Sequence, residues 1–165
     1  MSERRAVIFD LDNTIADDGW RIPRIEWSSD SPIVRYHNYH LLAAFDEVGN
    51  EELFEGLDVE DIDVYIFTAR PMIYQAITTE WLERKGILYK ALFMRPDEDH
   101  DKSVDLKKRQ LFNLFANFDV QPSDIIAAYD DREDVVKMYQ DHNVAGKRVC
   151  IHNVCAYTDP VGRKK

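Results

Sequence analysis

The chain has 165 residues, 45% of them apolar and 12% aromatic, a composition typical of one compact folded domain and not of a disordered chain. Its 21 Lys and Arg against 31 Asp and Glu give a formal net charge of −10, which disfavours an extended nucleic-acid-binding surface but allows a nucleotide in one cleft that holds a metal and a few cations. We expect a cytoplasmic protein without membrane contact, because no apolar run approaches the roughly 20 residues of a membrane span, the N-terminus lacks a signal-peptide pattern and two cysteines are too few for a disulfide framework.

The first expected element is a strand at residues 6–9 (AVIF), which runs directly into Asp10. Residues 18–48 follow with little regular pattern, apart from an expected helix near 34–45, and we interpret them as a small cap inserted after the first strand. Their aromatic side chains allow two interpretations, either stacking on a nucleobase over the site or packing the insertion onto the domain. These side chains are Trp20, Trp27, Tyr36 and Tyr39.

A helix expected at residues 50–57 leads into a second strand at 64–67 (VYIF), inside the apolar run 62–69. Pro71 is favoured in the first turn of a helix, so a helix is predicted to follow it. The apolar face of that helix is predicted from spacing to comprise Ile73, Ala76, Ile77 and Trp81.

Three more strands are expected at residues 91–94, 125–129 and 148–151, separated by amphipathic helices. One helix carries Leu111, Leu114, Phe115 and Phe118, and the other carries Val135, Met138 and Tyr139. Short apolar strands alternating with amphipathic helices predict an α/β fold, a Rossmann-like three-layer sandwich. We therefore expect a single domain over residues 1–165, with a central parallel sheet of about five strands.

Acidic pairs stand where two of these strands end. Asp10 and Asp12 are two residues apart, so in an extended chain their carboxylates point the same way and repel each other. A second pair, Asp130 and Asp131, follows the fourth strand. Because the carboxyl ends of parallel strands meet at one edge, the sequence predicts a magnesium site formed by these four acids.

Phosphate-binding groups are expected at the same edge. Thr68 ends the second strand before a helix, where a hydroxyl beside backbone N–H groups could hold a phosphoryl oxygen. A lysine near the start of the next helix could neutralise the phosphate, and spacing favours Lys107, with Lys102 as the alternative. Each signal is weak alone, since acid pairs often cap helices, but their order along the chain favours one site.

The string Asp10-Leu11-Asp12-Asn13-Thr14 resembles the first motif of the haloacid dehalogenase (HAD) superfamily, and Thr68, Lys107 and Asp130-Asp131 resemble the other three. Within that superfamily the chain is most similar to the 3′-phosphatase domain of phage-type polynucleotide kinases. The likeness lies in Thr68-Ala69-Arg70 and Asp130-Asp131-Arg132, and in Arg21, eleven residues after the nucleophile position.

The resemblance implies a Mg²⁺-dependent phosphomonoesterase in which Asp10 becomes transiently phosphorylated and Asp12, aided by a raised pKa, serves as acid and base. It implies that Asp10, Asp131 and the backbone carbonyl of Asp12 hold the metal, and that Asp130 holds Lys107 or shares the metal. The implied substrate-binding residues are Arg21, Thr68, Ala69, Arg70 and Lys107.

The resemblance has departures and leaves alternatives. No Gly-rich kinase loop is present, so a free-standing phosphatase is expected, and Ser103 stands where the family often has an aspartate. The implied substrate is a 3′-phosphorylated nucleic-acid end or 3′-nucleotide; a nucleoside 5′-monophosphate is the alternative. A non-catalytic module is disfavoured because the acids are all retained. Cys150, His152 and Cys155 are expected to be structural rather than zinc ligands.

Overall fold

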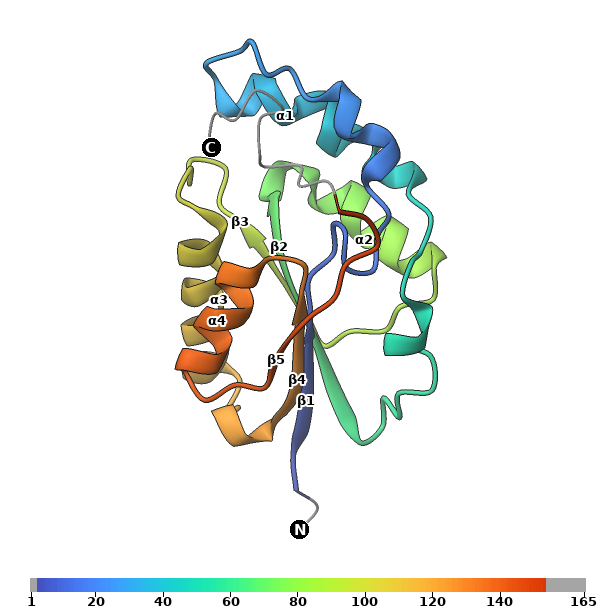
Figure 1. The fold of residues 1–165 in the computed structure, drawn as a ribbon. Coiled ribbons are helices and arrows are strands. Elements are labelled where there is room, and N and C mark those ends of the chain that lie inside the picture. Colours follow the sequence, from blue (N-terminus) through green and yellow to red (C-terminus); the bar gives the residue numbers. More distant parts are fainter. Residues whose placement is uncertain (1–2, 154–165) are drawn as a thin grey trace.

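A computed structural model describes residues 3–153 of the chain (Figure 1). Its centre is a five-stranded sheet in the order β3-β2-β1-β4-β5, and every neighbouring pair is parallel. This architecture confirms the predicted α/β fold with a parallel sheet of five strands. The strands are Arg5–Phe9 (β1), Ile62–Pro71 (β2), Ala91–Arg95 (β3), Ile125–Asp130 (β4) and Gly146–Arg148 (β5).

The central strand β1 is buried on both faces, which explains its unbroken apolar run. Ala6 and Ile8 belong to one hydrophobic cluster, whereas Val7 and Phe9 belong to the cluster on the opposite side of the sheet. Successive side chains of a strand point to opposite faces, so a strand covered by helices on both sides must be apolar at every position.

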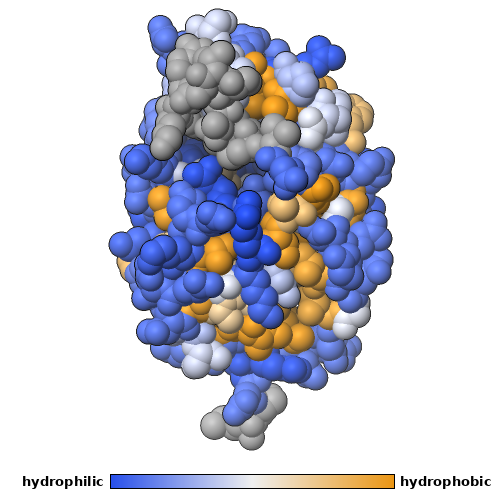
Figure 2. All heavy atoms as spheres, viewed as in Figure 1, coloured by the Kyte–Doolittle hydropathy of each residue, from blue (hydrophilic) through white to orange (hydrophobic). Residues whose placement is uncertain are grey.

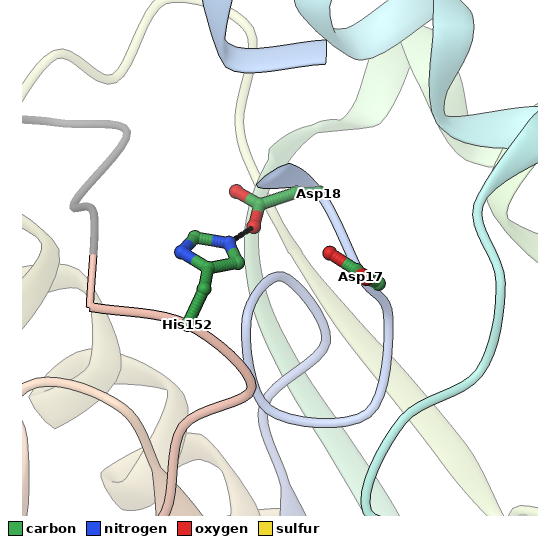
Figure 3. A group of neighbouring side chains, drawn as sticks. All are labelled: Asp17, Asp18 and His152. Carbon is green, nitrogen blue, oxygen red and sulfur yellow. Dashed lines mark hydrogen bonds and ion pairs between the residues drawn. The ribbon is translucent and has the colours of Figure 1, made fainter. Parts of the chain in front are cut away.

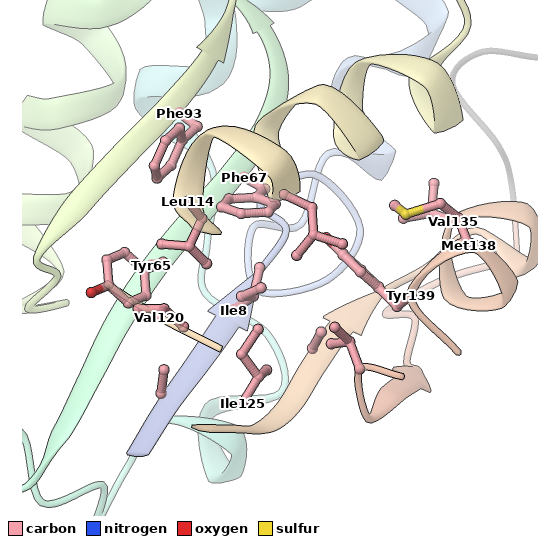
Figure 4. Packing of buried hydrophobic residues seen from close by; sticks show 14 residues of the cluster. Ile8, Tyr65, Phe67, Phe93, Leu114, Val120, Ile125, Val135, Met138 and Tyr139 are labelled. Carbon is pink, nitrogen blue, oxygen red and sulfur yellow. The ribbon is translucent and has the colours of Figure 1, made fainter. Parts of the chain in front are cut away.

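Helices cover the two faces of the sheet. The helices α3 (Ser103–Asn117) and α4 (Glu133–Asp141) lie on one face, and α2 (Gln75–Arg84) lies on the other (Figure 1). The apolar stripes predicted for α3 and α4 do face the sheet. Figure 4 shows Leu114, Met138 and Tyr139 packed towards the side chains of the strands, and all three are buried.

The chain differs from prediction around α2. A short 3₁₀ turn, Met72–Tyr74 (η4), precedes the helix, which begins only at Gln75. Of the predicted face, Trp81 is fully buried, but Ile73 is 68% exposed because the extra turn rotates it away from the sheet. Tyr74 and Thr78 are buried on this face instead of Ile73.

Two other expected elements are also corrected. The fifth strand is Gly146–Arg148, so the expected range 148–151 overlaps it only at Arg148. Its sequence, GKR, offers no apolar signal for a strand, since it is a short edge strand. The helix expected at 50–57 is only a 3₁₀ turn, Glu51–Leu53 (η3), and Asn50 before it has a left-handed backbone with φ 51°.

Residues 18–48, here called the cap segment, lie across the carboxyl ends of the strands (Figure 1). They contain the 3₁₀ turns Gly19–Arg24 (η1) and Leu42–Phe45 (η2) and the helix Pro32–Leu41 (α1). Tyr36 and Tyr39 are buried in a small core of this segment, which supports the packing interpretation for these two aromatic residues. The remaining members of this core are Ile22, Ile25 and Trp27.

The molecular surface is consistent with this layered core. Polar side chains cover most of the face shown in Figure 2, including the outer sides of α3 and α4. Within residues 3–153, none of the helices combines the length and the apolar character needed to cross a bilayer.

Candidate active site

Asp10 lies directly after the central strand β1 and is held from three directions. Its backbone N–H donates to the carbonyl of Tyr129 at 3.0 Å. The Thr14 hydroxyl donates to Asp10 Oδ2 at 2.9 Å, and Lys107 Nζ donates to Asp10 Oδ1 at 2.8 Å. The carboxylate is therefore buried at the edge of the sheet in one fixed orientation.

Lys107 is the lysine of this site. Its ammonium donates to Asp10, to Asp130 Oδ2 at 2.9 Å and to the carbonyl of Phe67 at 2.7 Å. Burial alone would lower the pKa of Lys107, but the carboxylates of Asp10 and Asp130 raise it well above its usual value, so the side chain stays charged. Lys102, the alternative, is exposed just before α3.

Three carboxylates crowd together beside this lysine. The ligand oxygens of Asp10, Asp130 and Asp131 all lie within 4.8 Å of one another. Burial, reinforced by Asp130, raises the pKa of Asp10 to about 7. Burial, reinforced by Asp10 and Asp130, raises the pKa of Asp131 to about 10. An all-oxygen group with this excess of negative charge suits a hard divalent cation such as Mg²⁺.

The carboxylate of Asp12 faces away from that group, towards two arginines. Its Oδ1 accepts from Arg21 Nη2 at 2.5 Å and from Arg70 Nη2 at 2.6 Å. Burial would raise the pKa of Asp12, but the guanidinium groups of Arg70 and Arg21 outweigh it and hold this pKa below its usual value. The expectation of a raised pKa is therefore wrong for the substrate-free protein. Metal binding by the Asp12 backbone carbonyl stays a prediction.

The cap segment supplies a buried partner for Arg21 that the sequence did not reveal. Asp46 accepts from Arg21 Nε and Nη2, each at 2.8 Å, and neither side chain is exposed to solvent. Arg21 Nη1 donates to the carbonyl of Tyr39 at 2.9 Å. An isolated aspartate in an irregular segment gives no local signal, so only the folded structure identifies Asp46.

Thr68, Ala69 and Arg70 lie inside β2, because this strand continues to Pro71. Thr68 is therefore not at the junction of a strand and a helix, as the sequence suggested. The pairing of β2 with β3 shifts register between Phe67 and Pro71, a local irregularity that can re-aim side chains beside a site. The buried Thr68 hydroxyl accepts from the Arg70 backbone N–H at 3.2 Å.

Asn13 is a second residue that sequence reasoning missed. It has φ 63°, in the left-handed region that asparagine adopts more readily than most residues. Its Nδ2 donates to Asp131 Oδ2 at 3.1 Å, and its Oδ1 accepts from the N–H groups of Ile151 and His152. Asn13 thus orients the Asp131 carboxylate and holds the segment of Ile151 and His152 beside the site.

Beside the site, His152 meets the start of the cap segment. Figure 3 shows its ring directed at Asp18, with Asp17 nearby, and His152 Nε2 lies 2.5 Å from Asp18 Oδ1. Their ligand atoms and that of Asp17 are close enough to hold a metal ion, although Asp18 and His152 already pair with each other. Cys150 is a free, half-buried thiol, and Cys155 lies outside the described residues.

Solved structures share this fold. A chain of the Pnkp1/Rnl/Hen1 RNA repair complex has a TM-score of 0.66 at 22% identity, covering 90% of this chain and 43% of that one. A haloacid dehalogenase-like hydrolase from Streptococcus pneumoniae has a TM-score of 0.62 at 13% identity, covering 88% and 84%. A HAD enzyme from Bacteroides thetaiotaomicron, in complex with magnesium and inorganic phosphate, has a TM-score of 0.57 at 10% identity, covering 88% and 93%.

The fold is that of HAD hydrolases, and the chain is a HAD-type phosphatase domain. The family model of the polynucleotide kinase PNKP phosphatase domain matches residues 4–150, so the chain belongs to that family. A bifunctional polynucleotide kinase/RNA ligase from Autographa californica nuclear polyhedrosis virus is 33% identical over 96 residues. That match covers 58% of this chain and 13% of the viral protein, so the chain spans a small part of its relative.

Proposed function

We propose that the protein is a Mg²⁺-dependent phosphomonoesterase that removes the terminal phosphate from 3′-phosphorylated nucleic acids or 3′-nucleotides. The observation that carries this proposal is the group formed by Asp10, Lys107 and Asp131, which combines a buried carboxylate, a charged ammonium and a metal-binding partner at the end of the central strand. Membership of the polynucleotide kinase phosphatase family supports a nucleic-acid end as the substrate.

Asp10 is the proposed nucleophile. Its carboxylate oxygen attacks phosphorus, the bond from phosphorus to the leaving oxygen breaks, and an aspartyl-phosphate forms. The Lys107 ammonium, already bound to Asp10, neutralises part of the charge of the incoming phosphate. A bound Mg²⁺, held by Asp10 and Asp131 with Asp130 close by, would offset more of that charge. The buried Thr68 hydroxyl is a proposed donor to a phosphoryl oxygen.

Asp12 is the proposed acid and base. It gives a proton to the departing sugar oxygen and later takes one from the water that hydrolyses the aspartyl-phosphate. In the substrate-free protein Arg21 and Arg70 keep it ionised. A phosphate dianion beside Asp12 would raise the pKa of this carboxyl by charge repulsion. The dianion would also attract Arg21 and Arg70, which weakens their interaction with Asp12. Substrate binding therefore favours the protonated form of Asp12.

The test compares the wild type with Asp10→Asn and with the control Asp61→Asn. Asp61 is exposed and lies just before β2, at the end of the strand away from the site. With Mg²⁺ and a 3′-phosphorylated oligonucleotide, Asp10→Asn is expected to lose activity by about a thousandfold or more, because a neutral amide cannot act as the carboxylate nucleophile. Circular dichroism should show that both variants are folded. Retained turnover in Asp10→Asn would refute the assignment.

The same assay addresses the substrate. The panel adds each nucleoside 5′-monophosphate, and omits Mg²⁺ in parallel samples. Faster turnover of the 5′-monophosphates than of the 3′-phosphorylated oligonucleotide would favour a 5′-nucleotidase instead. Strong inhibition by salt with the oligonucleotide alone would indicate contacts along its phosphate backbone.

A further inference from the structure

A cavity of about 100 Å³ opens beside the site, between the cap segment and the ends of β2 and β3. One water molecule needs only about 10–15 Å³ of such space, so the cavity has room for a ring rather than for a single ion or water. Its walls come from α1, from the 3₁₀ turn η4 and from the loop after β3, and include Ile33, Tyr36, Ile73 and Tyr74.

The cavity adjoins the group that handles the leaving oxygen. Ala69, one of its lining residues, lies between Thr68 and Arg70, and its carbonyl accepts from Arg95 Nε at 3.1 Å. His40, another lining residue, is buried, and its ring lies 5.0 Å between centroids from that of Tyr39, whose backbone carbonyl accepts from Arg21. A molecule in the cavity would therefore contact the segment of β2 that carries Arg70, a hydrogen-bonded partner of Asp12.

The wall of the cavity holds a fixed aromatic ring. Tyr74 is buried, its hydroxyl lies 2.8 Å from His37 Nδ1, and its ring lies 5.0 Å from that of His40 between centroids. Ile33 and Ile73 border the same cavity but are 58% and 68% exposed, so part of their apolar surface still faces water. Such walls favour a flat, partly apolar occupant.

The lining of the cavity includes both a hydrogen-bond donor and an acceptor, Arg95 and Asp97. Arg95 is buried and uses Nε and Nη1 within the protein, whereas its Nη2 has no hydrogen bond with any residue between 3 and 153. Asp97 Oδ1 accepts from the N–H of Ile73, which leaves the second oxygen of an exposed carboxylate. A guanidinium and a carboxylate together match the acceptors and donors on the edge of a heterocyclic base.

We propose that this cavity, which is lined by Ile33, Ile73, Tyr74, Arg95 and Asp97, binds the nucleobase of the nucleotide that carries the phosphate. The proposal rests on the proposed function and adds that the enzyme reads one terminal base. Binding one base rather than a long strand also suits a protein with a net charge of −10.

The test compares two oligonucleotides that differ only in the terminal nucleotide, one with a base and one abasic, each with a 3′-phosphate. The wild type should show a higher kcat/KM for the terminus with a base. In the double variant Ile33→Ser/Ile73→Ser, this preference should fall about tenfold, because apolar contact with the base is lost. Both residues are mostly exposed, so the fold is expected to persist.

Leu88→Ser is the matched control, since Leu88 is 63% exposed and does not border this cavity. It should keep the wild-type preference. Equal rates on the two termini in the wild type, or an unchanged preference in the double variant, would overturn the proposal.

A binding measurement separates this proposal from the proposed function. Asp10→Asn, titrated with a nucleoside 3′-monophosphate and with ribose 3-phosphate, should bind the nucleotide more tightly, and Ile33→Ser/Ile73→Ser in that background should remove the difference. If the wild type hydrolyses neither oligonucleotide, the proposed function is refuted. The titration still shows in that case whether the cavity binds a nucleobase. Equal affinity for the two ligands would refute base binding.

Discussion

Arg21 and Asp46 form an ion pair in which Nη2 and Oδ2 lie 2.8 Å apart and neither side chain reaches solvent. Arg21 lies in η1 and Asp46 follows η2, so the pair joins the two ends of the cap segment. The same Arg21 Nη2 also contacts Asp12 at 2.5 Å. The position of the cap and the orientation of Asp12 are therefore linked through one guanidinium group.

Replacing Asp46 by alanine should destabilise the protein by about 3 kcal/mol, because the buried charge of Arg21 loses one of its two carboxylate partners and keeps only Asp12. Activity should fall as well, since Arg21 then no longer fixes Asp12. Urea unfolding gives the free energy change. The control is Asp63→Ala, which removes an exposed pair with Lys90 at 3.0 Å and should cost only about 0–1 kcal/mol. Similar costs for both variants would contradict the inferred importance of the buried pair.

Lys107→Met should reduce kcat/KM by at least about a hundredfold, because the ammonium that holds Asp10 and offsets negative charge in the site is lost. The matched variant Lys102→Met removes an exposed lysine from the same region and should stay within about twofold of the wild type. Steady-state kinetics on a 3′-phosphorylated oligonucleotide compares them, and a melting curve shows that each is folded. A severe loss in Lys102→Met instead would reverse the choice between the two lysines.

Magnesium should stabilise the protein more at high pH than at low pH. In the metal-free fold the pKa values of Asp10 and Asp131 are about 7 and about 10, above the usual 3.8. The folded chain thus holds these protons more tightly than the unfolded chain does. Their stabilising effect is complete below about pH 4 and is lost as pH rises through 7 towards 10, with a slope of at most about 1.4 kcal/mol per pH unit for each proton.

A bound cation replaces those protons and removes the repulsion. The rise in Tm on adding Mg²⁺ should therefore grow between about pH 5.5 and about pH 8.5, as scanning calorimetry would measure. Ca²⁺ and K⁺ serve as comparison ions. In Asp10→Asn, which removes one of the crowded carboxylates, the growth with pH should be smaller. An increment that is the same at both pH values would argue against a cation site formed by these acids.

Much of the fold is visible in the sequence because the buried strands carry continuous apolar runs. Residues 6–9 and 125–129 are apolar on both faces, and the helices between them carry stripes at helical spacing. The edge strand β5 escaped prediction since GKR has no apolar side chain. The predicted buried face of α2 was wrong because the helix begins only after the 3₁₀ turn η4. The spacing of apolar residues does not reveal this turn, which changes the direction in which Ile73 points.

The site was predictable to the extent that its residues follow strand ends. Asp10, Asp130 and Asp131 meet because parallel strands end at one edge, and Lys107 reaches them from the first turns of α3. The partners of Asp12 required the structure. No local sequence pattern distinguishes Asp46 from other aspartates in the cap segment. Its structural role follows only from the tertiary contact with Arg21.

The central position of β1 has a consequence for synthesis of the protein. Ala6 has no pairing partner on either side until later residues have been synthesised, because its neighbours are Asp63 in β2 and Ile125 in β4. The ribosome must therefore release the chain as far as β4 before β1 is paired on both sides, so Asp10 stays exposed to solvent during that part of synthesis. Substitutions that weaken the joining of β1 and β4 should then lower the yield of folded enzyme in cells more than the activity of the molecules that do fold.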